Sequence, residues 1–97
     1  MKTRPWTFLT YHGRVLIYIA KHPQATGREI AREIGITERA VQQVIYDLVN
    51  EGYILRQKSG RSNTYTIHPE IPMRHRLERE HAVGDILNAL GYNPWQW

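Results

Sequence analysis

Apolar residues recur with helical spacing in the first half of the chain. Around residues 10–21 they surround almost the whole circumference, from Val15 to Ala20, which predicts a helix covered on more than one side. Pro23 ends this helix, because proline cannot continue a helix and restricts the residue before it.

Two further helices follow, and each carries its own start signal. Thr26 and Glu29 form a capping box at the start of the second helix, and Gly35 suits the left-handed residue that ends it. Thr37 is a good N-cap for a third helix over about residues 37–51. One face of this third helix is apolar at helical spacing: Val41, Val44, Ile45 and Leu48.

Alternation replaces the helical spacing after residue 52. Tyr53-Ile54-Leu55 and the alternating residues 64–68 predict two strands, and the turn-forming residues 59–63 join them into a hairpin over residues 53–68. Two prolines then bracket a linker, and a last helix is expected over residues 73–90. Its apolar stripe consists of Leu77, Val83, Ile86, Leu87 and Leu90. The predicted fold is mainly α with a small β-hairpin (α+β).

Length and composition set the limits of this interpretation. The 97 residues predict one domain over residues 1–97, with an N-terminal arm (1–9), a core (10–68) and the last helix. The absence of cysteine excludes disulfides and thiolate chemistry. No apolar run approaches the ~20 residues that span a bilayer, and the N-terminus lacks a signal-peptide pattern, so the expected location is the cytoplasm.

Neither catalysis nor a cofactor is expected. His68, His75 and His81 are spaced by seven and six residues, so no two of them share a helical face, and no metal site is predicted. Serine, histidine and aspartate are present, but no nucleophile motif frames them. We therefore expect a protein that is not an enzyme.

Charge is distributed unevenly along the chain. Residues 1–28 and 52–69 contain basic residues and no Asp or Glu, whereas residues 29–51 carry an acidic excess. Basic stretches without acids suit an anionic partner such as nucleic acid.

The order helix, helix, tight turn, helix, hairpin, helix is that of a helix-turn-helix with a wing. Over residues 10–68 the sequence resembles the winged helix-turn-helix regulators of the MarR/ArsR superfamily, in a short form with a single wing. The resemblance rests on the runs at residues 15–19, 26–37 and 48–54. It implies a transcriptional regulator that binds double-stranded DNA with its third helix in the major groove.

Two groups of residues are predicted to contact DNA. The face of the third helix opposite its apolar stripe, together with its first turn, suits base edges, since Gln pairs with adenine and Arg with guanine. These base-reading candidates are Thr37, Glu38, Arg39, Gln42, Gln43 and Tyr46. The candidates for the DNA backbone are Arg14, Arg28 and Arg32 and, in the wing, Arg56, Lys58, Arg61, Ser62 and Asn63. In the families that the chain resembles, an aspartate often precedes the wing arginine by two residues, where Ser59 stands here.

The apolar ends of the chain predict a homodimer. Candidate interface residues are Leu77, Val83, Ile86, Leu87, Leu90, Trp95 and Trp97. The same stripe also suits packing of the last helix on the first within one chain, so both arrangements stay open. An alternative function is that of a winged-helix module that docks proteins within a larger complex, because the acidic residues 29–51 repel phosphate. No residue indicates an effector ligand.

Overall fold

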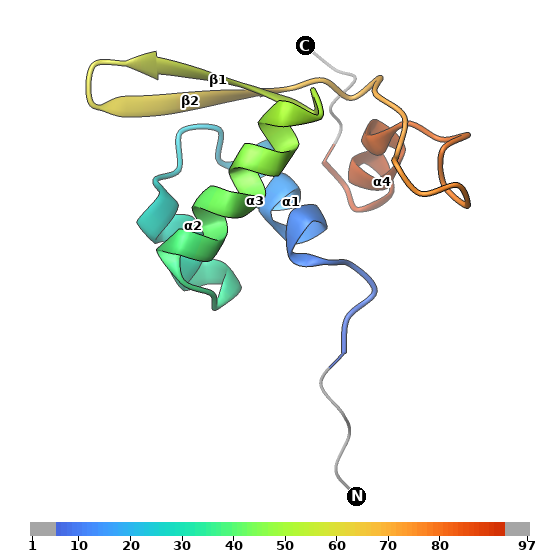
Figure 1. Cartoon of the computed structure of the whole chain (residues 1–97), viewed down its shortest axis with the longest axis horizontal. Helices are drawn as coiled ribbons and strands as arrows, with labels where there is room; N and C mark the ends of the chain where they lie inside the picture. The colour runs from blue at the N-terminus through green and yellow to red at the C-terminus, as the bar shows by residue number, and fades with distance from the viewer. Residues whose placement is uncertain (1–5, 93–97) are drawn as a thin grey trace, which may run out of the picture.

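The computed structural model describes residues 6–92 (Figure 1). Within this range the chain forms four helices and one two-stranded sheet. In order they are α1 (Tyr11–Lys21), α2 (Gly27–Ile34), α3 (Glu38–Asn50), β1 (Ile54–Ser59), β2 (Ser62–Ile67) and α4 (Val83–Ala89). The first three helices pack together, and the hairpin projects from them as a wing (Figure 1). The predicted α+β class is confirmed.

Capping side chains fix the start of α2 and α3 as the sequence predicted. The Thr26 hydroxyl accepts from the Glu29 amide at 3.0 Å, and the Thr37 hydroxyl accepts from the Ala40 amide at 3.0 Å. The reciprocal half of the capping box is not formed, because Glu29 instead accepts a hydrogen bond from the Tyr18 hydroxyl at 3.1 Å. Partial burial and this bond raise the pKa of Tyr18.

The turn between α2 and α3 is short because of one glycine. Gly35 has φ of 86°, in the left-handed region, and its amide bonds the Ala31 carbonyl at 2.8 Å. Residues 35–37 alone then connect the two helices. This is the tight turn of the helix-turn-helix.

The core lies where α1, α2, α3 and the base of the wing meet. Val15 and Ile19 of α1, Ile30 of α2, and Val41 and Ile45 of α3 are all fully inaccessible to solvent. Ile17 and Tyr18 pack partly buried against this cluster, so α1 is covered on more than one side, as predicted. Burial of this kind supplies most of the stability of a small domain.

The wing is a tighter hairpin than the sequence predicted. β1 and β2 pair antiparallel from Ile54↔Ile67 to Ser59↔Ser62, so Gly60 and Arg61 alone form the turn. Ser62 and Asn63, expected in the turn, belong to β2 instead. The Tyr65 amide donates to the Pro23 carbonyl at 2.9 Å, which ties the wing to the loop between α1 and α2.

The predicted helix over residues 73–90 is wrong in its first half, since only α4 (Val83–Ala89) is helical. Residues 72–82 form a closed loop whose ends meet. Pro72 and Ala82 form an isolated bridge, and the Val83 amide bonds the Ile71 carbonyl at 2.9 Å. Leu77 is 76 % exposed, so this loop lacks the buried stripe that would favour a helix.

The candidate dimer residues lie in different surroundings in the structure. Leu87 is fully buried in the core cluster of this chain, and Val83 packs partly buried against that cluster, so α4 is attached to its own domain. Leu77 is exposed but lies on the loop rather than on a helix. Ile86 is half-buried and Leu90 is 50 % exposed. Trp95 and Trp97 lie outside the described residues.

Candidate nucleic-acid interface

The polar face of α3 is exposed, as the sequence predicted. Its buried residues all point to the core, and the opposite side of the helix carries Arg39, Gln43, Tyr46 and Asn50. The side chains of these four are exposed, and the Tyr46 ring is 62 % exposed. We name these four residues the α3 ridge.

Gln42 lies at the edge of this ridge next to α2. A Cβ atom added to Gly27 would lie only 2.5 Å from Gln42 Nε2, so the absence of a side chain at Gly27 leaves room for the Gln42 amide. Glu38, also predicted to read bases, lies beside α2 as well, where its carboxylate is 3.5 Å from Arg28 Nε. Thr37 uses its hydroxyl to cap α3.

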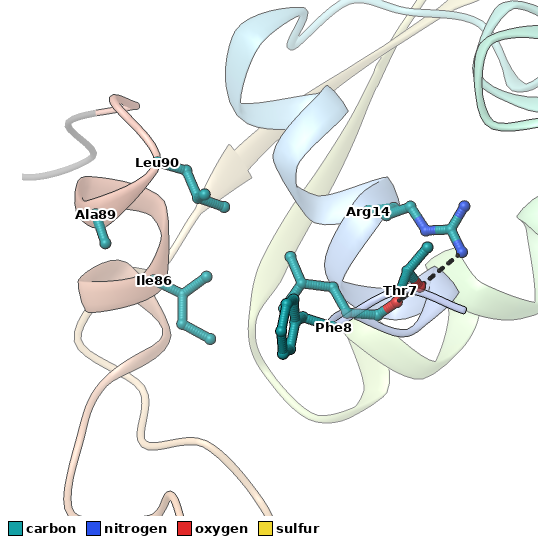
Figure 2. Close-up of a pocket in the computed structure, with 7 residues that line it drawn as sticks. Thr7, Phe8, Arg14, Ile86, Ala89 and Leu90 are labelled. Atoms are coloured by element: carbon teal, nitrogen blue, oxygen red, sulfur yellow. Dashed lines mark hydrogen bonds between the residues drawn. The ribbon is translucent and has the colours of Figure 1, made fainter. Parts of the chain in front are cut away.

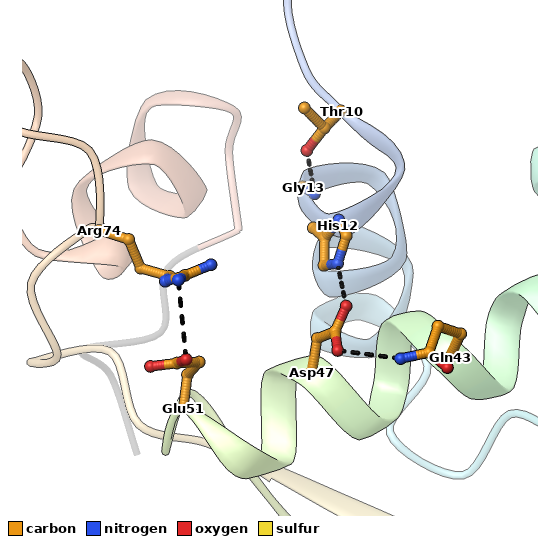
Figure 3. Close-up of polar contacts among 7 residues, drawn as sticks. All are labelled: Thr10, His12, Gly13, Gln43, Asp47, Glu51 and Arg74. Atoms are coloured by element: carbon orange, nitrogen blue, oxygen red, sulfur yellow. Dashed lines mark hydrogen bonds and ion pairs between the residues drawn. The ribbon is translucent and has the colours of Figure 1, made fainter.

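The other edge of the ridge faces α1. Asp47 Oδ2 accepts from His12 Nε2 at 2.8 Å, and Asp47 Oδ1 accepts from Gln43 Nε2 at 3.1 Å (Figure 3). The hydrogen bond to His12 is the main cause that lowers the pKa of the Asp47 carboxyl, and the bond to Gln43 contributes in the same direction. The carboxylate therefore stays charged and holds two side chains.

The wing carries the uncompensated positive charge. Arg56 and Lys58 of β1 and Arg61 of the turn are exposed, and within residues 6–92 none of the three takes part in an ion pair. In the strand pairing, Arg56 lies opposite Tyr65 and Lys58 lies opposite Asn63, so both cations share one face of the hairpin with Tyr65. That face is buried at Tyr65 and Ile67, near the helices, and open to solvent toward the turn. Side chains as long as these extend beyond the strands toward solvent.

The backbone candidates on the helices lie in different places. Arg28 is 83 % exposed in its pair with Glu38, and Arg32 of α2 is exposed. Arg14 contacts the N-terminal segment and its own helix. Its Nη2 donates to the Thr7 hydroxyl at 3.2 Å, and its guanidinium lies over the Tyr11 ring.

Arg14 lines an apolar groove between the N-terminal segment and α4 (Figure 2). One wall is formed by residues 7–9 and the other by Ile86, Ala89 and Leu90. Phe8, on the first wall, is 93 % exposed, and its ring meets the Trp6 ring edge to face at 5.1 Å. This groove is separate from the α3 ridge and the wing.

Residues 6–92 contain neither a metal-binding cluster nor a membrane-spanning helix. No group of three or more His, Asp or Glu side chains there is arranged to hold a metal ion. In the same range no helix has the length and apolarity that crossing a bilayer requires.

Sequence reasoning missed two members of this surface. Asn50 follows Tyr46 by four residues and therefore shares its face, so the helical spacing alone was a sufficient signal. The bond between His12 and Asp47 joins positions 35 residues apart, and no local pattern carries such a signal.

Comparison with protein families agrees with this geometry. The family model described as "MarR family" matches residues 7–62, which include α1, α2, α3, β1 and the turn of the wing. The chain belongs to the MarR family of winged-helix transcription regulators. Proteins of this family are, in general terms, DNA-binding regulators rather than enzymes, and they typically form dimers.

One curated relative extends the comparison to a longer protein. The chain is 33 % identical over 66 residues to the uncharacterized protein MJ1254 of Methanocaldococcus jannaschii. The match covers 67 % of this chain but only 14 % of that relative. A related segment therefore also occurs within a much longer polypeptide.

Proposed function

We propose that this protein is a sequence-specific regulator of transcription that places α3 in the major groove of duplex DNA and the wing on the DNA backbone or in the minor groove. The observation that carries this proposal is the contrast between two exposed surfaces. The α3 ridge offers hydrogen-bonding side chains and one cation, and the wing offers three cations without an ion-pair partner among residues 6–92.

Base reading falls to α3 in this proposal. A Gln amide matches the N6 and N7 edge of adenine, and the Arg39 guanidinium matches the O6 and N7 edge of guanine, at about 1–3 kcal/mol of discrimination for each good pair. Asn50 extends the surface by one turn, and Tyr46 provides apolar contact for a thymine methyl. The first turn, with Thr37 and Glu38, lies where recognition helices commonly meet bases.

Phosphate binding falls to the wing and to α2. Arg56, Lys58 and Arg61 neutralise phosphates, with Ser62 and Asn63 as hydrogen-bond donors beside the turn. Arg61 at the tip reaches the minor groove, where narrow A·T tracts attract arginine. Arg28 and Arg32 support the same role from α2. Because Arg14 contacts Thr7 and Tyr11 instead, it is the weakest of the backbone candidates.

The same proposal includes a homodimer. Two recognition helices reach successive major-groove half-sites when they lie about 34 Å apart, one turn of DNA. The exposed apolar residues of the groove, Phe8 and Leu90 with Ile86, supply the surface that a second copy covers. Ile86→Glu with Leu90→Glu is expected to give a monomer in sedimentation equilibrium. Leu77→Glu, on the exposed loop, is the matched control and leaves the dimer intact.

A salt titration of duplex binding tests the function itself. Binding at micromolar or lower concentration is expected at low salt, with log affinity falling linearly against log salt because phosphate contacts release counterions. Absence of duplex binding at low salt rejects the proposal. It would favour a module that docks proteins, for which the longer relative and the exposed Trp6 and Phe8 are the supporting observations.

A further inference from the structure

Two hydrogen bonds that share Asp47 connect His12 of α1 to Gln43 at the centre of the α3 ridge (Figure 3). Asp47 lies at the border of the ridge, with 39 % of its side chain exposed, and Gln43 lies on the ridge itself. Two neighbours of Asp47 come from different helices, since His12 belongs to α1 and Gln43 to α3. The Asp47 carboxylate is thus held from α1 by His12, while it also accepts a hydrogen bond from Gln43 on its own helix.

The hydrogen-bond chemistry of these groups determines which way the Gln43 amide faces. A carboxylate only accepts hydrogen bonds, so the amide must turn its Nε2 toward Asp47 and its carbonyl oxygen away. One N–H of the amide is then occupied. The carbonyl oxygen and the second N–H stay free, and these are the acceptor and donor that the N6 and N7 edge of adenine requires.

We propose that Asp47, held by His12, is a positioning residue that presents Gln43 to an adenine in the major groove. Asp47 itself touches no base. This inference rests on the proposed DNA-binding function and adds the identity of the base that Gln43 reads. Asp47 strengthens the binding of Gln43 to adenine by preorganisation, because an amide already held in its bound orientation loses less conformational freedom on binding.

Asp47 also has an effect on general affinity for DNA, and this effect is unfavourable. The two effects can therefore be measured separately. A negative charge beside the ridge repels phosphate and lowers affinity for every duplex. A carboxylate that was merely exposed would have this effect alone. A positioning carboxylate also governs the preference for one base, and that preference responds to the hydrogen bond rather than to the charge.

The test compares Asp47→Ala with Asp47→Asn on duplexes selected by the wild-type protein from a random pool. Both variants are expected to bind random duplex more tightly than wild type, because both remove the charge. Asp47→Ala is expected to lose roughly tenfold in preference for one adenine, the share of a single bidentate contact. Asp47→Asn keeps that preference, because its Oδ1 still accepts from Gln43 and its Nδ2 donates to His12 Nε2 once the neutral imidazole carries its proton on Nδ1.

A modified base identifies the contact. Replacing that adenine by 7-deazaadenine removes the N7 acceptor, and wild type is expected to lose roughly tenfold in affinity. Gln43→Ala and Asp47→Ala lose nothing further from the same replacement. Thermal melts of both variants serve as the check on folding, since Asp47 is partly exposed and outside the core.

Three results overturn the inference. These are retention of the full adenine preference by Asp47→Ala, equal loss of that preference in the two Asp47 variants, and a set of selected duplexes in which no adenine depends on Gln43. Absence of all duplex binding by the wild-type protein at low salt is a different result, since it rejects the proposed function and this inference with it.

Discussion

The α3 helix and the wing differ in whether their charged side chains have partners. Two carboxylates on α3 and at its C-cap form ion pairs with arginines, Glu38 with Arg28 and Glu51 with Arg74, and the third, Asp47, accepts hydrogen bonds from His12 and Gln43. In residues 6–92 the wing cations Arg56, Lys58 and Arg61 have no such partner. The helix therefore presents hydrogen-bonding side chains whose orientation is fixed, with little net charge. The wing presents net positive charge on side chains whose orientation is not fixed by ion pairs. Discrimination between sequences and general affinity for DNA are expected to respond to different substitutions.

The largest effect is expected from the wing. Lys58→Ala with Arg61→Ala removes two phosphate contacts, and the slope of log affinity against log salt becomes shallower by about two. Affinity falls equally for selected and random duplexes. Fluorescence anisotropy at several salt concentrations measures both quantities.

The matched control for the wing removes two charges elsewhere. Arg76→Ala with Arg79→Ala changes the net charge by the same amount, but both residues lie on the exposed 72–82 loop. Its salt slope is expected to stay at the wild-type value. Equal slopes for the two double variants would show that net charge, and not the wing, governs affinity.

A smaller effect, on sequence preference, is expected from α3. Gln43→Ala is expected to cost about 1–3 kcal/mol at one base position while leaving the salt slope unchanged. Gln42→Ala costs less, because the Gln42 amide lies against Gly27 at the edge of the ridge. Competition between selected and single-base-changed duplexes measures the difference. A larger loss for Gln42 than for Gln43 contradicts our assignment of the ridge.

Next in size is the exposed pair at the start of α3. Glu38→Gln removes a negative charge 3.5 Å from Arg28 and frees that guanidinium for phosphate. Affinity for all duplexes is expected to rise by about 0.2–1 kcal/mol, the range of exposed ion pairs. Arg28→Ala, measured in the same anisotropy assay, should reverse the gain. Failure of Arg28→Ala to do so would place that arginine away from DNA.

The smallest effect concerns stability and pH. The pKa of Asp47 is lowered in the folded state from its ordinary value of 3.8, mainly by the bond to His12. Its stabilising contribution is therefore present above that ordinary value and lost as the pH falls through the folded pKa. The melting temperature of wild type should exceed that of Asp47→Ala at neutral pH, and the two should converge at the acidic end. A constant gap across the titration contradicts this linkage.

The first three helices were predictable because their signals are local. Thr26, Thr37 and Gly35 specify where α2 and α3 begin and end, and each acts within four residues of its own position. The start of α4 was not predictable in this way. Residues 73–82 contain good helix formers, but contacts between residues distant in sequence, such as Val83 with Ile71, close them into a loop instead.

The candidate interface also has features that local sequence signals predict and features that depend on contacts between distant residues. Helical spacing alone placed Arg39, Gln43 and Tyr46 on an exposed face, since burial of the opposite stripe leaves no other choice. The residues that each of these side chains contacts depend on the tertiary structure. His12 of α1 contacts Asp47 and Arg28 of α2 contacts Glu38, and spacing within α3 does not identify either of these partners.

Tyr53 connects three parts of this molecule through hydrogen bonds. Its amide bonds the Leu48 carbonyl at 2.9 Å, its carbonyl accepts from the His68 amide at 2.8 Å, and its hydroxyl donates to the Pro72 carbonyl at 2.8 Å. One buried residue thus joins the end of α3, the base of the wing and the segment that leads to α4. Bending at this junction would have to break these hydrogen bonds or expose the buried Tyr53 ring. In the proposed pair of copies joined near α4, the Tyr53 bonds would therefore couple the position of the joint to the position of each recognition helix.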